Sequence, residues 1–463
     1  MNKEILSRRL RTDLERLVSG KVADDAASIT AVSTDYGGTV VKTPKVVVSP
    51  RDASEVAAVV AYAYQHDLPI SPRAGSFAFS GQALNEGGVV LDMRGLDAFD
   101  ILGQSADRCI ADAGTLWKDV VGAALTRRRV PPVLTSYLGT SIGGTLSAAG
   151  FGNASFRHGT QLDHCLELEV AGHDGELVRC SLDENRDLFE LALGGFGQFG
   201  VITRAVVRLR PCALRTRTYF LQYVDLETQL ADQRRLMTEQ RVTFMDGIVR
   251  SCLHGARLGE RGPERLYSYL YPLTLTVEAD DESTIDDQAV LGDLGFSRWV
   301  YADDLSMADF LLMGTPAGEP KATTSLAQIF TDVLLPWEEV ESFLGKVERH
   351  VLPRTVNVEH VRLGAVPRAA LTRPMLRVPE SEHIMGLGIY TATPRRLADH
   401  NLAMAQGFVD LAMKVGATYY LTGAVRLDEA RYQRQFGDDW PRVLAGKRQY
   451  DPKGLFNPGF FAR

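Results

Sequence analysis

The chain between residues 45 and 93 alternates apolar runs with polar, turn-forming stretches. A run of three valines predicts a short strand, and the capping-box spacing of Asp52 and Glu55 predicts that a helix begins directly after it. Four apolar residues then recur on one face of that helix: Val56, Val59, Val60 and Ala63. Two more apolar runs, at 68–73 and 87–93, enclose a loop of small residues. The pattern therefore predicts the order strand, helix, strand, loop and strand.

A second stretch of mixed helix and strand, from about 107 to 211, contains an apparent dinucleotide motif. Residues 195–200, Gly-Phe-Gly-Gln-Phe-Gly, match G-x-G-x-x-G. A Rossmann site needs a strand before this motif and a helix after it. Here a helical pattern (187–193) precedes the motif and an alternating strand pattern (201–209) follows it, which excludes that kind of nicotinamide site. Two interpretations stay open: a plain helix-to-strand turn, or glycines that let the backbone approach another planar ligand.

The remaining chain divides into a leading segment, a middle lobe and a tail. The first 34 residues predict one helix followed by a polar connector. In the middle lobe, from about 216 to 418, predicted strands at 218–223, 264–271 and 384–390 alternate with predicted helices at 227–240, 337–350 and 394–415. The tail at 450–459 is rich in turns but carries apolar anchors, which predicts that it docks on the rest of the molecule.

The composition excludes several classes of function. The chain has 463 residues, of which 45% are hydrophobic and 24% charged, and its net charge of −7 argues against a nucleic-acid partner. No apolar run reaches the roughly 18 residues of a membrane span, and the charged start does not resemble a secretory signal. Five cysteines, odd in number and without a CxxC pair, indicate neither a disulfide framework nor a zinc site. We therefore expect a cytoplasmic protein with free thiols and no membrane partner.

Two further loops are rich in small residues, at 73–82 and 138–152. Small residues let successive backbone N–H groups turn toward an anion, and hydroxyl groups add donors. Each loop taken alone could be an ordinary surface loop. Three such loops within about 130 residues, none in a Rossmann context, favour one extended ligand with a phosphate end.

Five motifs together carry a family resemblance. They are Gly143–Gly150 (GGTLSAAG), Phe156–Gly159 (FRHG), Leu166–Leu168 (LEL), Gly194–Arg204 (GGFGQFGVITR) and the tail motif Tyr450–Lys453 with Asn457–Gly459. With them the chain resembles FAD-linked oxidases of the vanillyl-alcohol oxidase type, and most of all the cytokinin dehydrogenases. The resemblance covers nearly the whole chain from about residue 40 and fades between about 275 and 415.

The resemblance implies an α+β fold with a two-subdomain FAD-binding domain of the PCMH type and an α+β substrate domain that caps the flavin. The implied boundaries are 1–34 for an N-terminal helix and connector, 35–212 for the FAD-binding domain, 213–418 for the cap, and 419–463 for a C-terminal segment that completes the FAD domain.

The resemblance also implies a set of FAD contacts. Carried over position by position, they are Arg73, Ala74, Gly75, Ser76, Phe77, Ala78, Gln82, Ser136, Ser141, Gly144, Ser147, Phe151, Ile202 and Tyr420. The family's C-terminal Pro-Gly-Gln ends here in Phe460, so the contact of that glutamine is in doubt.

Two positions depart from the cytokinin dehydrogenase pattern. The histidine that bonds the flavin in that family is replaced by Phe77, whose ring has no nucleophilic nitrogen, so we expect FAD to bind without a covalent link. The family's catalytic aspartate is replaced by Ser136, which is not a base near neutral pH unless another group activates it. Because a positioned base contributes about 10²–10⁴ in rate, cytokinin oxidation is not expected. Ser136 then remains a hydrogen-bonding group, and the neighbouring Tyr137 is the best acid–base candidate.

The leading hypothesis is a flavoenzyme that oxidises a small organic substrate by hydride transfer to flavin N5, as a biosynthetic tailoring step, with O2 or another acceptor. A second hypothesis is a non-redox cyclisation or isomerisation in which the flavin is structural, and a third is ligand binding without catalysis. In the middle lobe Asp246, His360, Arg362 and Tyr390 could line a pocket, but surface or interface positions are favoured for each.

Overall fold

The computed structural model describes residues 3–259, 262–281, 284–315 and 325–459. Its first subdomain is a sheet of four short strands in the order β1-β2-β4-β3, in which β2, β4 and β3 run parallel. Its elements are α1 (Lys3–Glu15), β1 (Lys21–Ala23), α2 (Ala26–Val32), β2 (Val46–Ser49), α3 (Ala53–Gln65), β3 (Ile70–Arg73) and β4 (Val89–Asp92). This order confirms the strand–helix–strand–loop–strand prediction for residues 45–93.

The leading segment holds more structure than a helix and a connector. Strand β1 pairs antiparallel with β2, with Val22 opposite Val48, and α2 begins at an Asp25 cap whose carboxylate accepts the Ser28 N–H at 3.0 Å. The connector prediction was therefore wrong. Its apolar stretch is too short to show strand periodicity, and only the pairing with β2 makes it a strand.

The predicted cap of α3 forms, but only half of the capping box does. The Asp52 carboxylate accepts the Glu55 N–H at 2.9 Å. The Glu55 carboxylate instead accepts hydrogen bonds from Ser19 and from the Arg51 N–H. Glu55 therefore holds the chain that leads into β1 against the start of α3.

The second subdomain is an antiparallel sheet in the order β5-β6-β10-β8-β9. Its elements are β5 (Phe99–Leu102), β6 (Arg108–Asp112), α4 (Trp117–Leu125), β7 (Arg129–Val130), α5 (Ile142–Leu146), α6 (Ser155–His158), β8 (Cys165–Ala171), β9 (Leu177–Ser181), α7 (Arg186–Ala192), β10 (Val201–Arg208) and β11 (Arg210–Pro211). Helix α7 precedes the G-x-G-x-x-G turn and β10 follows it, which confirms that the motif is not of the Rossmann kind.

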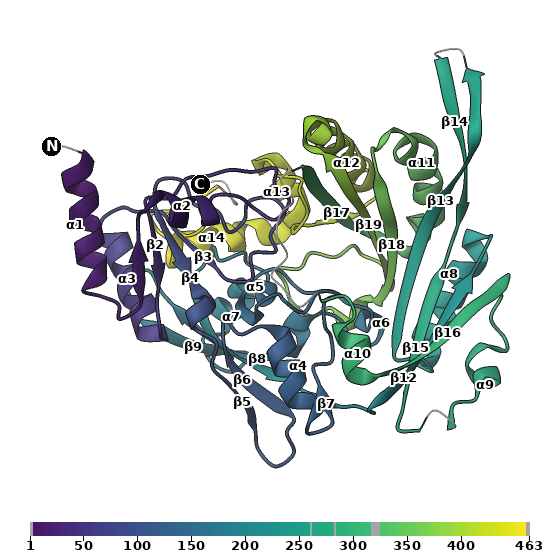
Figure 1. Ribbon diagram of the computed structural model, residues 1–463, viewed down its shortest axis with the longest axis horizontal. Helices are drawn as coiled ribbons and strands as arrows, with labels where there is room; N and C mark the ends of the chain where they lie inside the picture. Colours follow the sequence, from purple (N-terminus) through teal and green to yellow (C-terminus); the bar gives the residue numbers. More distant parts are fainter. Residues whose placement is uncertain (1–2, 260–261, 282–283, 316–324, 460–463) are drawn as a thin grey trace.

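The cap is a large sheet in the order β16-β12-β15-β13-β18-β19-β17-β20, with β14 paired to β13 (Figure 1). Its elements are β12 (Arg215–Gln222), α8 (Leu226–Glu239), β13 (Phe244–Gly259), β14 (Gly262–Leu270), β15 (Leu273–Ala279), α9 (Asp287–Leu291), β16 (Arg298–Ser306), α10 (Met307–Leu312), β17 (Leu326–Pro336), α11 (Val340–His350), β18 (Val358–Pro367), β19 (His383–Pro394), α12 (Ala398–Met413) and β20 (Thr418–Tyr420). Helix α12 packs on β17 and β19. The opposite face of β17 is left to face the two subdomains.

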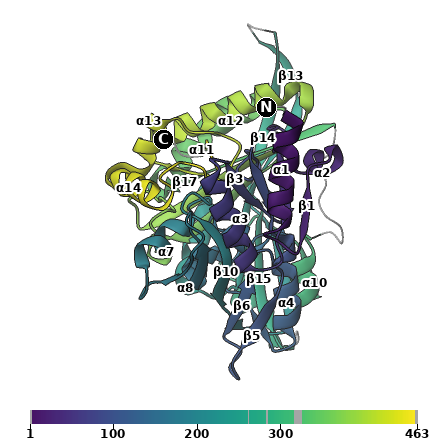
Figure 2. The same ribbon diagram turned by 90° about the vertical axis from the view of Figure 1, so that its left-hand side faces the viewer.

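The chain then returns from the cap to the first subdomain through α13 (Glu429–Phe436) and α14 (Trp440–Tyr450), shown in yellow in Figure 2. The tail adds to the edge of β3: the Ile70 N–H donates to Leu455 at 2.9 Å, and the Asn457 N–H donates to Ile70 at 2.9 Å. The expectation that the tail docks is correct. Strand β20 pairs with β17, so the cap sheet continues past the expected boundary at residue 418.

Within the described part of the chain, all five cysteines are free, and no group of His, Cys, Asp or Glu side chains is arranged to hold a metal ion. None of the helices described here is both long and apolar enough to cross a membrane.

Candidate functional site

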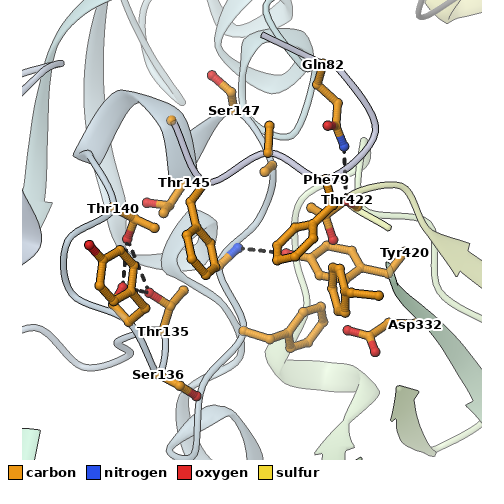
Figure 3. Close-up of a pocket in the computed structure, with 18 of the residues that line it drawn as sticks. Phe79, Gln82, Thr135, Ser136, Thr140, Thr145, Ser147, Asp332, Tyr420 and Thr422 are labelled. Carbon is orange, nitrogen blue, oxygen red and sulfur yellow. Dashed lines mark hydrogen bonds between the residues drawn. The ribbon is translucent and has the colours of Figure 1, made fainter. Parts of the chain in front are cut away.

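A cavity of about 580 Å³ lies where the two subdomains meet the cap sheet. Loops of small residues form one wall, and β17, β18, β19 and β20 form the other. Figure 3 labels residues of both walls, among them Ser147 of the loops and Asp332 of the cap. Every residue singled out for the site lines this cavity: Arg73, Ala74, Gly75, Ser76, Phe77, Ala78, Gln82, Ser136, Tyr137, Ser141, Gly144, Ser147, Phe151, Ile202 and Tyr420. Phe460 lies outside the described residues.

The first loop leaves β3 with its backbone donors unused. The N–H groups of residues 74–78 donate no hydrogen bond to any described residue. Ser76 adopts a left-handed conformation, with φ of 59°, and its hydroxyl donates to the Ala74 carbonyl at 2.9 Å. At Gly75 a Cβ would lie 2.8 Å from the Gly139 carbonyl oxygen, so glycine lets the two loops approach. A run of free N–H groups on a sharply turned backbone suits an anion.

The second loop is fixed mainly by its own hydroxyl groups. The Ser141 hydroxyl accepts the Gly144 N–H at 3.3 Å, and the Ser147 hydroxyl donates to the Gly143 carbonyl at 2.7 Å. At the end of the loop, the Gly150 N–H donates to the Tyr420 hydroxyl at 3.2 Å. Tyr420 thereby ties this loop to the edge strand of the cap sheet (Figure 3).

The G-x-G-x-x-G turn is the third loop on the wall. Gly197, Gly200 and Ile202 face the cavity, so the interpretation that these glycines let the backbone approach a ligand is the favoured one. The tail holds this turn in place, because the Asn457 amide donates to the Phe196 carbonyl at 2.8 Å.

Aromatic rings form a continuous chain from the loops to the cap. Successive ring centroids are 4.8 Å apart for Tyr137 and Phe77, 5.2 Å for Phe77 and Phe79, 5.0 Å for Phe79 and Phe330, 4.8 Å for Phe330 and Tyr390, and 4.4 Å for Tyr390 and His360. Phe77 therefore packs in a ring cluster, and its side chain carries no nucleophilic atom. The chain gives the substrate side of the cavity flat apolar surfaces.

Ser136 is held by a cation from the cap. Arg362 Nη1 donates to the Ser136 hydroxyl at 3.1 Å, Arg362 Nε donates to Asp246 Oδ1 at 2.7 Å, and the same guanidinium contacts the Asn153 side chain. The sequence favoured surface or interface positions for the four cap candidates. The surface assignment was wrong, since Asp246, His360, Arg362 and Tyr390 all line the cavity. For Arg362 the interface assignment was right, because it joins the cap to the second subdomain.

Asp332 is the ionisable residue of the wall that the sequence interpretation missed. It lies on β17, opposite Gly388 of β19 and Tyr420 of β20, and its Oδ1 has no hydrogen-bond partner among the described residues. Burial raises the pKa of Asp332 to about 7, although the Arg362 cation and the Tyr390 hydroxyl oppose this rise. The sequence could have indicated this residue, because Asp332 is the one charged residue in a strand of otherwise apolar and neutral residues.

Comparison with known proteins decides the family. The FAD binding domain model matches residues 44–181. The chain is 30% identical over 454 residues to the uncharacterized oxidoreductase ORF5 in the fasciation locus of Rhodococcoides fascians, covering 96% of this chain and 99% of that protein. It is 33% identical over 495 residues to cytokinin dehydrogenase 5 of Oryza sativa subsp. japonica, covering 95% and 90%. The chain belongs to the cytokinin dehydrogenase-like family of FAD-linked oxidoreductases.

Solved structures support the fold of this family member. Xylooligosaccharide oxidase from Myceliophthora thermophila C1, determined in complex with xylobiose, aligns with a TM-score of 0.78 at 16% identity over 97% of this chain and 98% of that one. The predicted α+β fold with a PCMH-type FAD-binding domain is therefore confirmed.

Two observations indicate that the residues of this oxidoreductase are suited to bind FAD. The unused N–H groups of residues 74–78 suit the pyrophosphate, and the close approach of the loops at Gly75 leaves no space for another side chain. A buried acceptor that lines the same cavity, Asn457 Oδ1, lacks a partner among the described residues and suits a donor of a bound nucleotide.

Proposed function

We propose that this flavoprotein oxidises a small amine or alcohol at the carbon that carries its N–H or O–H group, with FAD bound without a covalent link. The observation that carries the proposal is the single continuous cavity. Its loop wall offers free backbone donors, and its cap wall offers aromatic rings and ionisable side chains. A ligand on the cap wall would lie beside a cofactor held by the loops.

When bound, FAD supplies a two-electron oxidant that accepts hydride at N5. Different residues of this chain would bind the FAD, position its loops and exclude water. The N–H groups of residues 74–78 bind the pyrophosphate, and the Tyr420 hydroxyl positions the second loop through Gly150. The rings of Phe79, Phe330 and Tyr390 exclude water from the substrate side. O2 or another two-electron acceptor would regenerate the oxidant.

Cytokinins are not the proposed substrates, although several relatives carry the name cytokinin dehydrogenase. The hydroxyl at the position of the family's aspartate accepts a hydrogen bond from the Arg362 cation, and a serine in that environment does not take up a proton. A biosynthetic tailoring reaction on another small molecule fits a flavin fold whose usual base has been replaced.

Anaerobic mixing with candidate substrates tests the proposal. The purified protein should be yellow, and its long-wavelength flavin band should bleach when a substrate is added without oxygen. Product formation while the band stays unchanged would instead indicate a non-redox reaction. A colourless protein that FAD cannot reconstitute would overturn the proposal altogether.

Acid precipitation should release all the FAD into the supernatant, because Phe77 offers no nucleophilic nitrogen and none of the cysteines in the described part of the chain lines the cavity. The measurement is the flavin absorbance of pellet and supernatant. A Phe77→His variant is the informative comparison, since it restores the family's linking residue. A yellow pellet from the unmodified protein would contradict the assignment.

Restoring a carboxylate with Ser136→Asp is expected not to create cytokinin turnover. The new carboxylate would lie within reach of Arg362 and pair with it, so it would be a poor base. The expected result is FAD content equal to that of the unmodified protein and no bleaching with a cytokinin. Robust turnover would show that the cap is still a cytokinin pocket.

A further inference from the structure

Three cap strands and the edge strand bring four residues into one row beside the cavity. Arg362 on β18 lies opposite Gly388 on β19, Gly388 lies opposite Asp332 on β17, and Asp332 lies opposite Tyr420 on β20. Since Tyr420 binds the second loop, this row ends at the boundary between the cap and the loop wall. Asp332 is thus the carboxylate of the cap row next to the proposed cofactor loop (Figure 3).

The absence of a side chain at Gly388 makes room for this carboxylate. A Cβ at Gly388 would overlap Asp332 Oδ1. Next to it, Gly386 on β19 lies opposite Gly364 on β18, and all three glycines line the cavity. The sheet is therefore hollowed around Asp332, which lines the cavity, and its Oδ1 is buried beside Gly388 without a partner among the described residues.

No cation among the described residues forms an ion pair with the Asp332 carboxylate. The Arg362 cation is already paired with Asp246 at 2.7 Å. His360 adds no positive charge near neutral pH, because burial and the cations Arg250 and Arg362 lower its pKa. An ionised Asp332 on the cap wall is thus a negative charge that a positively charged ligand can neutralise.

The surfaces next to Asp332 suit the body of such a ligand. Phe330 is two residues from Asp332 on the same strand and face, and its ring lies 4.8 Å from Tyr390 and 5.0 Å from Phe79. Aromatic faces attract cations as well as apolar groups. A carboxylate surrounded by rings matches an ammonium group attached to a hydrophobic body.

We infer that the substrate is a hydrophobic, ring-bearing amine whose ammonium group binds Asp332, and that Asp332 takes the proton from that group before oxidation. The inference rests on the proposed function and adds its substrate class and its base. A neutral alcohol would leave the buried charge unpaired, so the site should discriminate against it.

The proposed steps balance in atoms and electrons. The substrate R–CH2–NH3⁺ transfers one proton to the Asp332 carboxylate and becomes the neutral amine R–CH2–NH2. The C–H bond then breaks, its electron pair leaves with the hydrogen as hydride to FAD, and the nitrogen lone pair forms the C=N bond of R–CH=NH2⁺. The two electrons pass from FAD to O2 or another acceptor, and the Asp332 proton returns to solvent.

The pH dependence follows from the groups that face Asp332. They are Arg362 from β18, Tyr390 from β19 and Tyr420 from β20, and Tyr419 on the other face of β20 also interacts with Asp332 electrostatically. The pKa of Arg362 is raised, mainly by Asp246 against the opposing effect of burial, and burial raises the pKa of each tyrosine, so none of the four changes charge near neutral pH. With a pKa of about 7 for Asp332, amine binding should weaken about tenfold per pH unit below that value.

The test uses cumylamine and cumyl alcohol as probes of the oxidised holoprotein. Neither has a hydrogen on the carbon next to its nitrogen or oxygen, so neither can be oxidised and binding is measured alone. Calorimetric titration at about pH 8 should show cumylamine binding at least about tenfold more tightly than cumyl alcohol. Asp332→Asn should weaken cumylamine at least about tenfold, abolish its pH dependence, and leave the alcohol within about threefold.

A matched variant controls for the loss of a carboxylate. Glu359→Gln makes the same chemical change at the solvent-exposed edge of the cavity, where screening keeps its effect small, so cumylamine binding should change less than about threefold. Gly388→Ala, which displaces Asp332 Oδ1 without removing it, should lower the preference for the amine. The FAD content and melting temperature of each variant establish that it is folded.

The outcomes separate this inference from the proposed function. Equal affinity for the two probes, or amine binding that Asp332→Asn leaves unchanged, would overturn the inference even if another substrate bleaches the flavin. Selective binding of cumylamine through Asp332, together with bleaching by benzylamine that falls at least about 100-fold in Asp332→Asn, would support both. Selective binding in a protein that no amine bleaches would support the ammonium site but overturn the assignment of Asp332 as base and the proposed oxidation of amines.

Discussion

Asp451→Asn is expected to destabilise the protein by about 3–5 kcal/mol, because it breaks a buried network that holds the tail. Asp451 is 2% exposed. Its Oδ1 accepts the Tyr64 hydroxyl at 2.7 Å and the Leu455 N–H at 2.8 Å. Its Oδ2 accepts the Phe456 N–H at 3.0 Å and lies 2.5 Å from Lys447 Nζ. An amide would point its NH2 group at two of these donors and leave the lysine without its buried counter-charge.

The measurement is thermal and urea unfolding of the variant, with the FAD content of the purified protein as a second readout. FAD should be lost in part, since the tail carries Asn457, which binds the third loop of the cavity. Asp67→Asn is the matched control: Asp67 pairs with Lys453 of the same tail at 2.6 Å, but its side chain is 74% exposed. That change should cost less than about 1 kcal/mol. Equal losses in the two variants would contradict the assignment.

Gly75→Val is expected to weaken FAD binding by about 100-fold or more. The new side chain would meet the Gly139 carbonyl at 2.8 Å and the Ser141 N–H at 3.2 Å, so the first and second loops would have to separate. Separation turns the free N–H groups of residues 74–78 away from the anion they are placed to meet. Two hydrogen bonds to a charged group, at about 1.5 kcal/mol or more each, account for a factor of this size.

FAD affinity is measured by reconstituting the flavin-free protein and following flavin fluorescence. Gly122→Val serves as the control, because a Cβ there meets nothing within 4 Å on the exposed side of α4. Valine is no worse a helix former than glycine, so FAD affinity and stability should stay within about 0.5 kcal/mol of the unmodified protein. Full FAD affinity in Gly75→Val would show that the loops need not approach closely.

The elements of the first subdomain were predictable because their signals are local. Helix α3 follows from the Asp52 cap and the spacing of Val56, Val59, Val60 and Ala63, all within one short segment. The order of elements around the G-x-G-x-x-G turn, with a helix before it and a strand after it, could likewise be predicted from the local patterns. Strand β1 was not, since a three-residue strand exists only through its pairing with β2.

The sequence by itself determined the three small-residue loops, the absence of a nucleophile at Phe77 and the absence of a carboxylate at Ser136, because each depends only on which residue stands at a position. Only the tertiary structure decided that Asp332 and Arg362 face the cavity. Their placement depends on the register of β18, β19, β17 and β20, which the chain visits far apart and out of order. Since a shift of one residue would turn every side chain of a strand to the opposite face, no local pattern could fix it.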